Sequence, residues 1–178
     1  YAAAAITGGS ILVRNVHSTS MQGDMRFLNV LEKMGCDVKE ERRGIRVTAP
    51  ADGTLHGIEI DMNDFSDQSM TLAAIAPFAK ESVYIKNIGH IRLQESDRIH
   101  AIVTELARLG VRVEEERDAV KIYPSDVKPA VVQTYDDHRM AMSFALIGLK
   151  VDGIVIDNYE CCKKTFENYF DVLESIEE

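Results

Sequence analysis

The fold of this chain is decided by the stretch Tyr135-Asp136-Asp137-His138-Arg139-Met140-Ala141-Met142, where titratable side chains are followed at once by an apolar run. The run continues to residue 149 and is apolar on nearly every side, which is typical of a helix buried all round rather than of an amphipathic surface helix. Asp136 or Asp137 is a suitable N-cap for this helix. We therefore predict a buried helix over 140–149 whose first turn carries the charged side chains.

This charged first turn has two interpretations. Backbone N–H groups at a helix N-terminus lack partners and the helix dipole favours anions, so Arg139 beside them would form a small anion-binding site. Alternatively, Asp137 is an ordinary N-cap and Arg139 is a surface residue. The eight residues by themselves leave both interpretations open.

The composition is that of an ordinary globular protein with an acidic surface. The chain has 178 residues, enough for one sizeable core or two small ones, and a formal net charge of −9. This charge argues against nucleic acid or an anionic membrane as a partner, although a local cluster of Arg and Lys could bind a small anion. No apolar run approaches the ~20 residues that span a bilayer, and the N-terminal segment lacks the basic flank of a signal peptide. The cysteines, Cys36, Cys161 and Cys162, have no metal-ligand spacing, so we interpret them as reduced thiols of a cytoplasmic protein.

A strand pattern recurs along the chain. Strand-like segments are found over 10–16, 82–88 and 153–158, and each has an asparagine, a turn-forming residue, at the same position near its end. These asparagines are Asn15, Asn87 and Asn158, at successive offsets of 72 and 71 residues. The spacing indicates a structural repeat of about 70 residues.

The segments that follow the first two strands also recur. Amphipathic helices are predicted to end at Met34 and at Leu109, the second starting near Gln94, and a glycine suited to a helix C-cap follows each. A β-hairpin is predicted after each glycine. The hairpins pair 36–40 with 45–48, and 111–115 with 119–123.

Apolar helices precede the second and third strands. They are predicted to open at Asp67 and at Asp137, and Pro77 should kink or end the first of them. The unit is thus strand, apolar helix, strand, amphipathic helix and hairpin, which predicts an α/β or α+β layered domain. Residues 2–6 look like the tail of a buried helix, and no hairpin follows the last predicted helix, 166–175. We therefore expect a fragment of a longer protein, or a domain completed by other segments.

The unusual residues lie at the predicted helix N-termini. They are Asp67, Gln94-Glu95-Ser96-Asp97-Arg98, Asp137-His138-Arg139 and Cys162-Lys163-Lys164-Thr165. Converging helix N-termini that carry Arg and Lys suit a multiply anionic ligand, and carboxylates among them could move protons. Each residue also has a plainer interpretation, as an N-cap, a solvated ion pair or a surface lysine. The residues alone support an enzyme and an anion-binding module equally.

Three segments resemble the signatures of a known family, 5-enolpyruvylshikimate-3-phosphate synthase. They are Leu93-Gln94-Glu95-Ser96-Asp97-Arg98, the stretch 135–142 quoted above, and Lys164-Thr165-Phe166-Glu167-Asn168-Tyr169-Phe170. The segments Ser20-Met21-Gln22-Gly23-Asp24 and Asp67-Gln68-Ser69-Met70 fit as well. The similarity is collinear and covers nearly the whole chain, so it is far more specific than any single motif.

This resemblance implies an α+β fold of repeated βαβαββ units, in which mixed sheets cover buried helices. Residues 1–178 would form the C-terminal globular half of an enolpyruvyl transferase, starting in mid-repeat, with the other half absent from this chain. The reaction implied is transfer of the enolpyruvyl group of phosphoenolpyruvate to the 5-hydroxyl of shikimate 3-phosphate, with release of phosphate and no metal or organic cofactor. This is a step of the shikimate pathway toward chorismate and the aromatic amino acids. The chain alone would be inactive.

The resemblance also implies roles for individual residues. Asp67 would accept the proton of the attacking hydroxyl and hold the shikimate ring, and Glu95 would donate a proton to the methylene carbon of phosphoenolpyruvate. The implied substrate-binding residues are Asp67, His90, Gln94, Arg98, Arg139 and Lys164. Among them the two arginines would bind the carboxylate of phosphoenolpyruvate, because planar guanidinium groups fit it well, and the lysine would pair with its phosphate.

The sequence departs from the family at two positions and leaves two alternatives. The family commonly has Asn at the position of His90 and Lys at that of Gln94, and Gln94 supplies no charge. One alternative is another enolpyruvyl transferase, with UDP-N-acetylglucosamine as acceptor, although its signatures are not found here. The other is a non-catalytic anion-binding domain of the same fold, which would have no need for two carboxylates.

Overall fold

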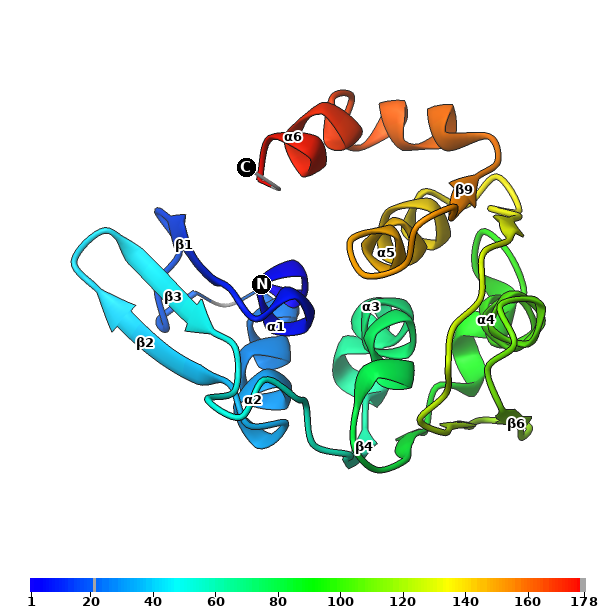
Figure 1. The fold of residues 1–178 in the computed structure, drawn as a ribbon, viewed down its shortest axis with the longest axis horizontal. Helices are drawn as coiled ribbons and strands as arrows, with labels where there is room; N and C mark the ends of the chain where they lie inside the picture. The colour runs from blue at the N-terminus through cyan, green and yellow to red at the C-terminus, as the bar shows by residue number, and fades with distance from the viewer. Residues whose placement is uncertain (21, 177–178) are drawn as a thin grey trace.

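The computed structural model describes residues 1–20 and 22–176 and has an α+β fold (Figure 1). Helices α1 (Ala2–Thr7), α3 (Ser69–Ile75) and α5 (His138–Gly148) lie next to one another in the middle of the molecule, inside a single main core. Met21, within the motif 20–24 quoted above, lies outside the described residues. No helix of the described part is both long enough and apolar enough to cross a membrane.

The first sheet is antiparallel and is formed by the N-terminal part of the chain. Its strand order is β1 (Ser10–Arg14), β3 (Gly44–Thr48) and β2 (Asp37–Glu41), with α2 (Arg26–Lys33) leading into the β2–β3 hairpin. Gly44 lies directly opposite Arg14, with φ of 151°, and a Cβ there would meet the carbonyl oxygen of Val13 at 2.0 Å. The close approach of two backbones therefore requires glycine at this position.

The second sheet is mixed and is formed by the middle of the chain. Its strand order is β4 (Glu59–Asp61), β5 (Val83–Lys86), β7 (Val120–Ile122) and β6 (Val113–Glu115). The β4–β5 pair is parallel and connected through α3, whereas the other pairs are antiparallel. Helix α4 (Arg98–Arg108) connects β5 to the β6–β7 hairpin.

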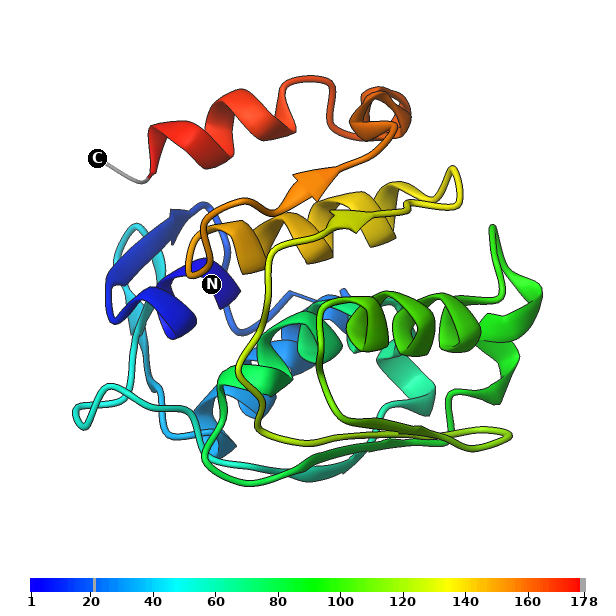
Figure 2. The same ribbon diagram turned by 45° about the vertical axis from the view of Figure 1, so that its right-hand side comes forward.

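The third sheet is the smallest and holds the C-terminal part. Strand β8 (Val131–Val132) pairs in parallel with β9 (Val155–Ile156), and α5 connects them. The chain then continues through η5 (Tyr159–Lys164) into α6 (Tyr169–Ser175), which passes over the α5 layer (Figure 2). The hydroxyl of Tyr169 donates to the carbonyl oxygen of Met142 at 2.8 Å and fastens α6 to α5.

The short 3₁₀ helices lie between these elements. They are η1 (Gly23–Met25), η2 (Asn63–Gln68), η3 (Ala76–Phe78) and η4 (Gly89–Leu93). Helix α3 ends at Ile75 and passes into η3, which contains Pro77, so the prediction that this proline ends the helix is confirmed. Both hairpins are also found where they were predicted.

Helix α5 confirms the prediction made from its sequence. It begins at His138 after the N-cap Asp137, and its residues are buried on nearly every side, Phe144 completely. The predicted start of another helix was wrong. Helix α4 begins at Arg98 rather than near Gln94, because Asp97 caps it by accepting a hydrogen bond from the N–H of His100 at 3.0 Å.

Two further boundaries differ from those predicted. Helix α3 begins at Ser69, and Asp67 lies in the preceding 3₁₀ turn with no side-chain cap at the start of either helix. The last helix begins at Tyr169, whereas the sequence pattern suggested residue 166. In both places a tighter turn uses the residues that the hydrophobic pattern assigned to the helix.

The three recurring asparagines have the same backbone conformation. Their φ values are 61° for Asn15, 58° for Asn87 and 50° for Asn158, all in the left-handed region, which asparagine tolerates better than most residues. The prediction that each asparagine forms a turn after its strand is therefore confirmed. The turns send the chain from the strands toward the helix starts that carry the charged residues.

Candidate active site

Arg98 lies at the centre of a charged cluster. It is the first residue of α4, and its side chain is only 4% exposed. Its Nε donates to Oδ2 of Asp137 at 2.7 Å and its Nη2 to Oδ1 of the same carboxylate at 3.3 Å. This bidentate pair joins the start of α4 to the start of α5, and buried pairs of this kind have a demanding geometry.

Asp67 lies between two guanidinium groups. Nη1 of Arg98 donates to its Oδ1 at 3.2 Å, and Nη2 of Arg139 lies 2.8 Å from its Oδ2. Gln94 also accepts a hydrogen bond from Nη1 of Arg98. The side chain of Asp67 is 40% exposed, so one face of this carboxylate remains open to a ligand.

Asp137 is completely buried and performs two tasks. Besides Arg98, its carboxylate accepts from the backbone N–H of Arg139 at 2.9 Å, which caps α5, and from Oγ of Ser96 at 3.1 Å. Burial acts to raise the pKa of Asp137, but the hydrogen bonds and charge of Arg98 outweigh it and hold this pKa below its usual value. Asp137 therefore stays ionised in the folded protein.

Glu95 forms the outer part of the cluster. Its Oε2 lies 3.2 Å from Nζ of Lys164 and 3.0 Å from Nδ1 of His138. The hydrogen bond to Glu95 is the main cause that raises the pKa of Lys164. Glu95 and Lys164 are 39% and 50% exposed at their side chains, so both can reach a ligand that arrives from solvent.

His90 lies at the edge of the cluster rather than in it. Its Nε2 is 2.7 Å from Oγ of Ser66, the residue before Asp67 in η2. The structure thus places Asp67, Arg98, Arg139 and Gln94 in direct contact, and it pairs Glu95 with Lys164. His138 lies between the two groups, 3.0 Å from Glu95 and 4.0 Å from Asp137. Among the contacts of the described residues, the side chain of His90 reaches these groups through this neighbouring turn.

Sequence reasoning did not assign Asp137 as the partner of Arg98. The stretch 135–142 identified it as a candidate N-cap, which the structure confirms. The ion pair spans 39 residues of sequence, so no local pattern could reveal it. The one available signal was its position among charged residues that open an apolar helix.

The carboxylates of the cluster that could bind a metal or cofactor are already paired with cations of the protein. Glu95, Asp137 and His138 place possible ligand atoms within 4.8 Å of one another. However, both oxygens of Asp137 accept from Arg98, and Glu95 pairs with Lys164, so the two carboxylates of this group already have cationic partners. The chemistry available is hydrogen bonding, anion binding and proton transfer by carboxylates.

The cysteines do not suit nucleophilic catalysis. Cys36, Cys161 and Cys162 are free and buried. Burial is the main cause that raises the pKa of Cys162 to about 12 and that of Cys36 to about 11. Buried thiols with raised pKa values are poorly reactive, because the thiolate is the nucleophile.

The structure resembles a solved one over almost all of its length. EPSP synthase from Acinetobacter baumannii matches with a TM-score of 0.84 at 24% identity, over 98% of this chain and 43% of that chain, which shows a shared fold. Curated relatives are more similar in sequence. The 3-phosphoshikimate 1-carboxyvinyltransferase of Nostoc punctiforme is 55% identical over 170 residues, which are 96% of this chain and 39% of that protein.

The same similarity extends to a plant protein. The chloroplastic 3-phosphoshikimate 1-carboxyvinyltransferase of Brassica napus is 44% identical over 181 residues, which are 98% of this chain and 35% of that protein. The chain thus spans about two fifths of the length of these curated relatives. A family model described as EPSP synthase (3-phosphoshikimate 1-carboxyvinyltransferase) matches residues 1–173. Because this match covers nearly the whole sequence, the chain belongs to the EPSP synthase family.

Proposed function

We propose that this chain supplies part of the active site of an enzyme that transfers the enolpyruvyl group of phosphoenolpyruvate to the 5-hydroxyl of shikimate 3-phosphate, with release of phosphate. The observation that carries the proposal is the arrangement of two partly exposed carboxylates: Asp67 is held by Arg98 and Arg139 from the starts of α4 and α5, and Glu95 by Lys164 at the end of η5. Addition followed by elimination needs one group to take a proton from the hydroxyl and another to give one to the methylene carbon. Two separately held carboxylates meet that need.

Asp67 is proposed as the base and Glu95 as the acid. Asp67 contacts two guanidinium groups and is 40% exposed, so its carboxylate is held in place to accept the proton of the attacking hydroxyl. Glu95 must be protonated to act as an acid. The phosphate of the substrate would compete with Glu95 for Lys164.

Arg139 and Lys164 are proposed as the main contacts to phosphoenolpyruvate. Their side chains are 29% and 50% exposed, so each can turn toward a ligand. The guanidinium group of Arg98 donates to Asp137 through Nε and Nη2, whereas its Nη1 donates to Gln94 and to the partly exposed Asp67. Arg98 therefore contributes to the substrate carboxylate through this one nitrogen and otherwise orients Asp67.

The positive and negative charges of the cluster balance, which limits its affinity for anionic substrates. Arg98, Arg139 and Lys164 are offset by Asp67, Glu95 and Asp137. Two phosphorylated substrates bring several negative charges, so tight binding of both requires cations from outside this chain, whereas phosphoenolpyruvate alone can bind weakly through Arg139 and Lys164. We propose that the missing half of the same enzyme supplies them, and that His90 and Gln94 contribute hydrogen bonds to shikimate 3-phosphate.

The same proposal extends to architecture and location. The order β4, α3, β5, α4, β6 and β7 supports the interpretation of the middle of the chain as one βαβαββ unit, flanked by parts of two others. Residues 1–178 would then be most of one globular half of the enzyme. Free cysteines favour a cytoplasmic location, and the acidic charge disfavours nucleic acid as a partner.

Phosphate release in the presence of both substrates tests this function. The chain alone should release no measurable phosphate, because proximity and orientation supply ~7–11 kcal/mol of such a barrier and one half cannot provide them. Restoring the missing half should give release with shikimate 3-phosphate and none with UDP-N-acetylglucosamine. In the restored protein, Glu95→Gln and Asp67→Asn should each lower kcat by roughly 10²–10⁴-fold, with smaller changes in substrate binding.

Matched controls separate this chemistry from general charge effects. Glu160→Gln removes an exposed carboxylate paired with Lys163, and Asp52→Asn removes one paired with Lys80; both should leave kcat unchanged. Transfer of the enolpyruvyl group to UDP-N-acetylglucosamine would show that shikimate 3-phosphate is the wrong acceptor. Full rates in the Glu95→Gln protein would remove Glu95 from the mechanism.

A further inference from the structure

Glu105 is a buried carboxylate that the proposed chemistry does not use. It lies in the C-terminal half of α4 and is completely buried. Its Oε1 accepts the hydroxyl of Tyr135 at 2.8 Å, and its Oε2 accepts the backbone N–H of Gln133 and Nε of Arg108, each at 3.0 Å. Two of these three bonds go to the segment that leads into α5, so a buried charge is placed to hold that segment.

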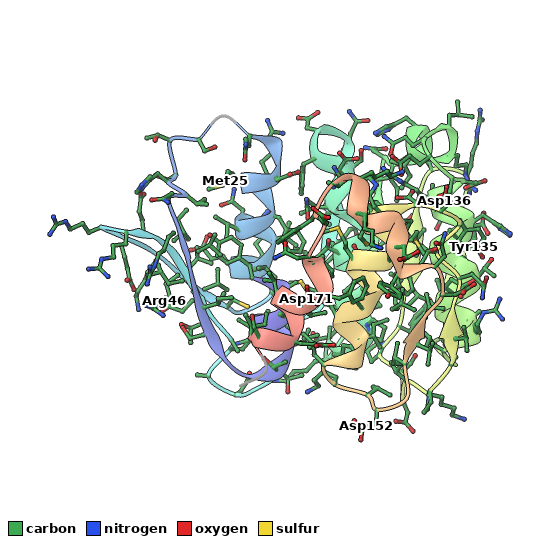
Figure 3. All side chains as sticks on the ribbon, turned by 90° about the horizontal axis from the view of Figure 1, so that it is seen from above. Met25, Arg46, Tyr135, Asp136, Asp152 and Asp171 are labelled. Carbon is green, nitrogen blue, oxygen red and sulfur yellow. The ribbon has the colours of Figure 1, made fainter. Side chains whose placement is uncertain are left out.

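The segment that Glu105 holds has an unusual backbone. Tyr135 and Asp136 both have φ of 56°, and two successive left-handed residues that are not glycine are costly unless their surroundings fix them. Figure 3, in which both residues are labelled, places them beside α4. The turn closes with the N–H of Asp137 donating to the carbonyl oxygen of Thr134 at 2.9 Å.

This turn sets the direction of the side chains that follow it. Asp137, His138 and Arg139 come next in the chain and contact Arg98, Glu95 and Asp67 respectively. The link also extends to the segment that carries Lys164: Oδ1 of Asp136 accepts from Nδ2 of Asn158 at 3.1 Å, and Asn158 is the N-cap of η5. One strained turn is therefore connected to both cations proposed to bind phosphoenolpyruvate.

We infer that Glu105 and Tyr135 are positioning residues, which fix the left-handed turn at Tyr135–Asp136 and thereby orient Arg139 and Lys164 toward the substrate. The hydroxyl of Tyr135 is suited to this task because burial, followed by its bond to Glu105, raises its pKa and keeps it a donor. The part of the inference that concerns phosphoenolpyruvate depends on the proposed function. The part that concerns the turn does not.

Amide hydrogen exchange of the Tyr135→Phe chain tests the turn directly. Loss of one hydroxyl should speed exchange at the amides of Asp137 and Arg139 by roughly three- to tenfold, the range expected for one lost hydrogen bond, while the amide of Ile147, later in α5, changes less. Tyr123→Phe is the matched control, because its hydroxyl donates to Glu114 at 2.9 Å in the β6–β7 region. This control should leave all three amides unchanged.

Titration with phosphoenolpyruvate gives the second readout. The dissociation constant should rise about three- to tenfold in Tyr135→Phe and remain unchanged in Tyr123→Phe. Glu105→Gln keeps one acceptor oxygen for three donors, so it should have a larger effect than Tyr135→Phe on both readouts. If the unsubstituted chain fails to bind phosphoenolpyruvate, the proposed ligand is wrong, and exchange alone then decides the inference.

The inference is overturned if exchange at Asp137 and Arg139 is the same in Tyr135→Phe as in the Tyr123→Phe control. It is also overturned if all amides of α5 accelerate equally, because a uniform loss of stability is what a purely structural bond would produce. Where Glu105→Gln does not fold, the two tyrosine variants still decide the outcome.

Discussion

Arg26 and Arg98 occupy matching positions in two parts of the molecule but have different surroundings. Each follows a left-handed asparagine, Asn15 or Asn87, by 11 residues, and each is the first residue of an amphipathic helix. The side chain of Arg26 is 54% exposed and contacts Asp64, which is 65% exposed, at 2.6 Å. Arg98 is 4% exposed and is bound by the completely buried Asp137.

The difference shows what a local sequence pattern determines. Both arginines stand at the same distance from a left-handed asparagine and at the start of a helix. The buried carboxylate that makes Arg98 part of a site comes from the start of α5, 39 residues away along the chain. In the N-terminal part the described contact of Arg26 is with an exposed side chain of η2, so the same arrangement yields a solvated pair.

Replacing each arginine by glutamine should show the largest difference between the two regions. Arg98→Gln leaves Asp137 buried without its cation, and breaking such a pair costs about 3–5 kcal/mol. Arg26→Gln removes an exposed pair and should cost less than ~1 kcal/mol. The free energy of unfolding of both variants, measured in urea, makes the comparison. Equal losses in the free energy of unfolding would mean that the buried Arg98–Asp137 pair stabilises the fold no more than the exposed Arg26–Asp64 pair does.

Acid should weaken the Arg98 region selectively. The pKa of Asp137 is held below its usual value of ~3.9, so its ionised form contributes stability that is fully present above that value and is lost as pH falls through the folded-state pKa. Asp137→Asn should therefore be less stable than the unsubstituted chain near neutral pH, with the gap narrowing below about pH 4. Urea unfolding across pH 2–7 measures this, and a gap independent of pH would contradict it.

Much of the fold could be predicted because its signals are local. The apolar run 140–149 predicted α5, Pro77 predicted the end of α3, and the glycines after two helices predicted the hairpins. The start of α4 was misplaced because Asp97, inside a run of polar residues, wins the competition to cap the helix.

The contacts of the site were less accessible from sequence. The resemblance to a family supplied the candidate residues, and the structure connects Asp67 with both Arg98 and Arg139. Neither the Arg98–Asp137 pair nor the bond from Tyr135 to Glu105 could be predicted, because partners 39 and 30 residues apart leave no periodic trace. Long-range polar contacts of this kind depend on tertiary packing.

The smallest expected difference concerns the recurring asparagines. Glycine tolerates a left-handed backbone, so Asn15→Gly tests the turn alone, and we expect a change within about 0.5 kcal/mol. Asn87 also donates from its side chain to Asp61, so Asn87→Gly should cost about 0.5–1.5 kcal/mol for the lost hydrogen bond. Thermal unfolding of the two variants provides the measurement. A larger loss of stability for Asn15→Gly than for Asn87→Gly would contradict this prediction.

An NMR titration of the labelled chain with phosphoenolpyruvate, followed at the backbone amides, tests whether the site lies at the buried cluster. We expect weak, saturable shifts concentrated at Arg139, at Lys164 and around Glu95, with none at Arg26 and its neighbours. Arg139→Gln should abolish the shifts at Lys164, whereas Arg26→Gln should leave them unchanged. Shifts spread equally over both regions, or centred on Arg26, would contradict the assignment of the site to the buried cluster.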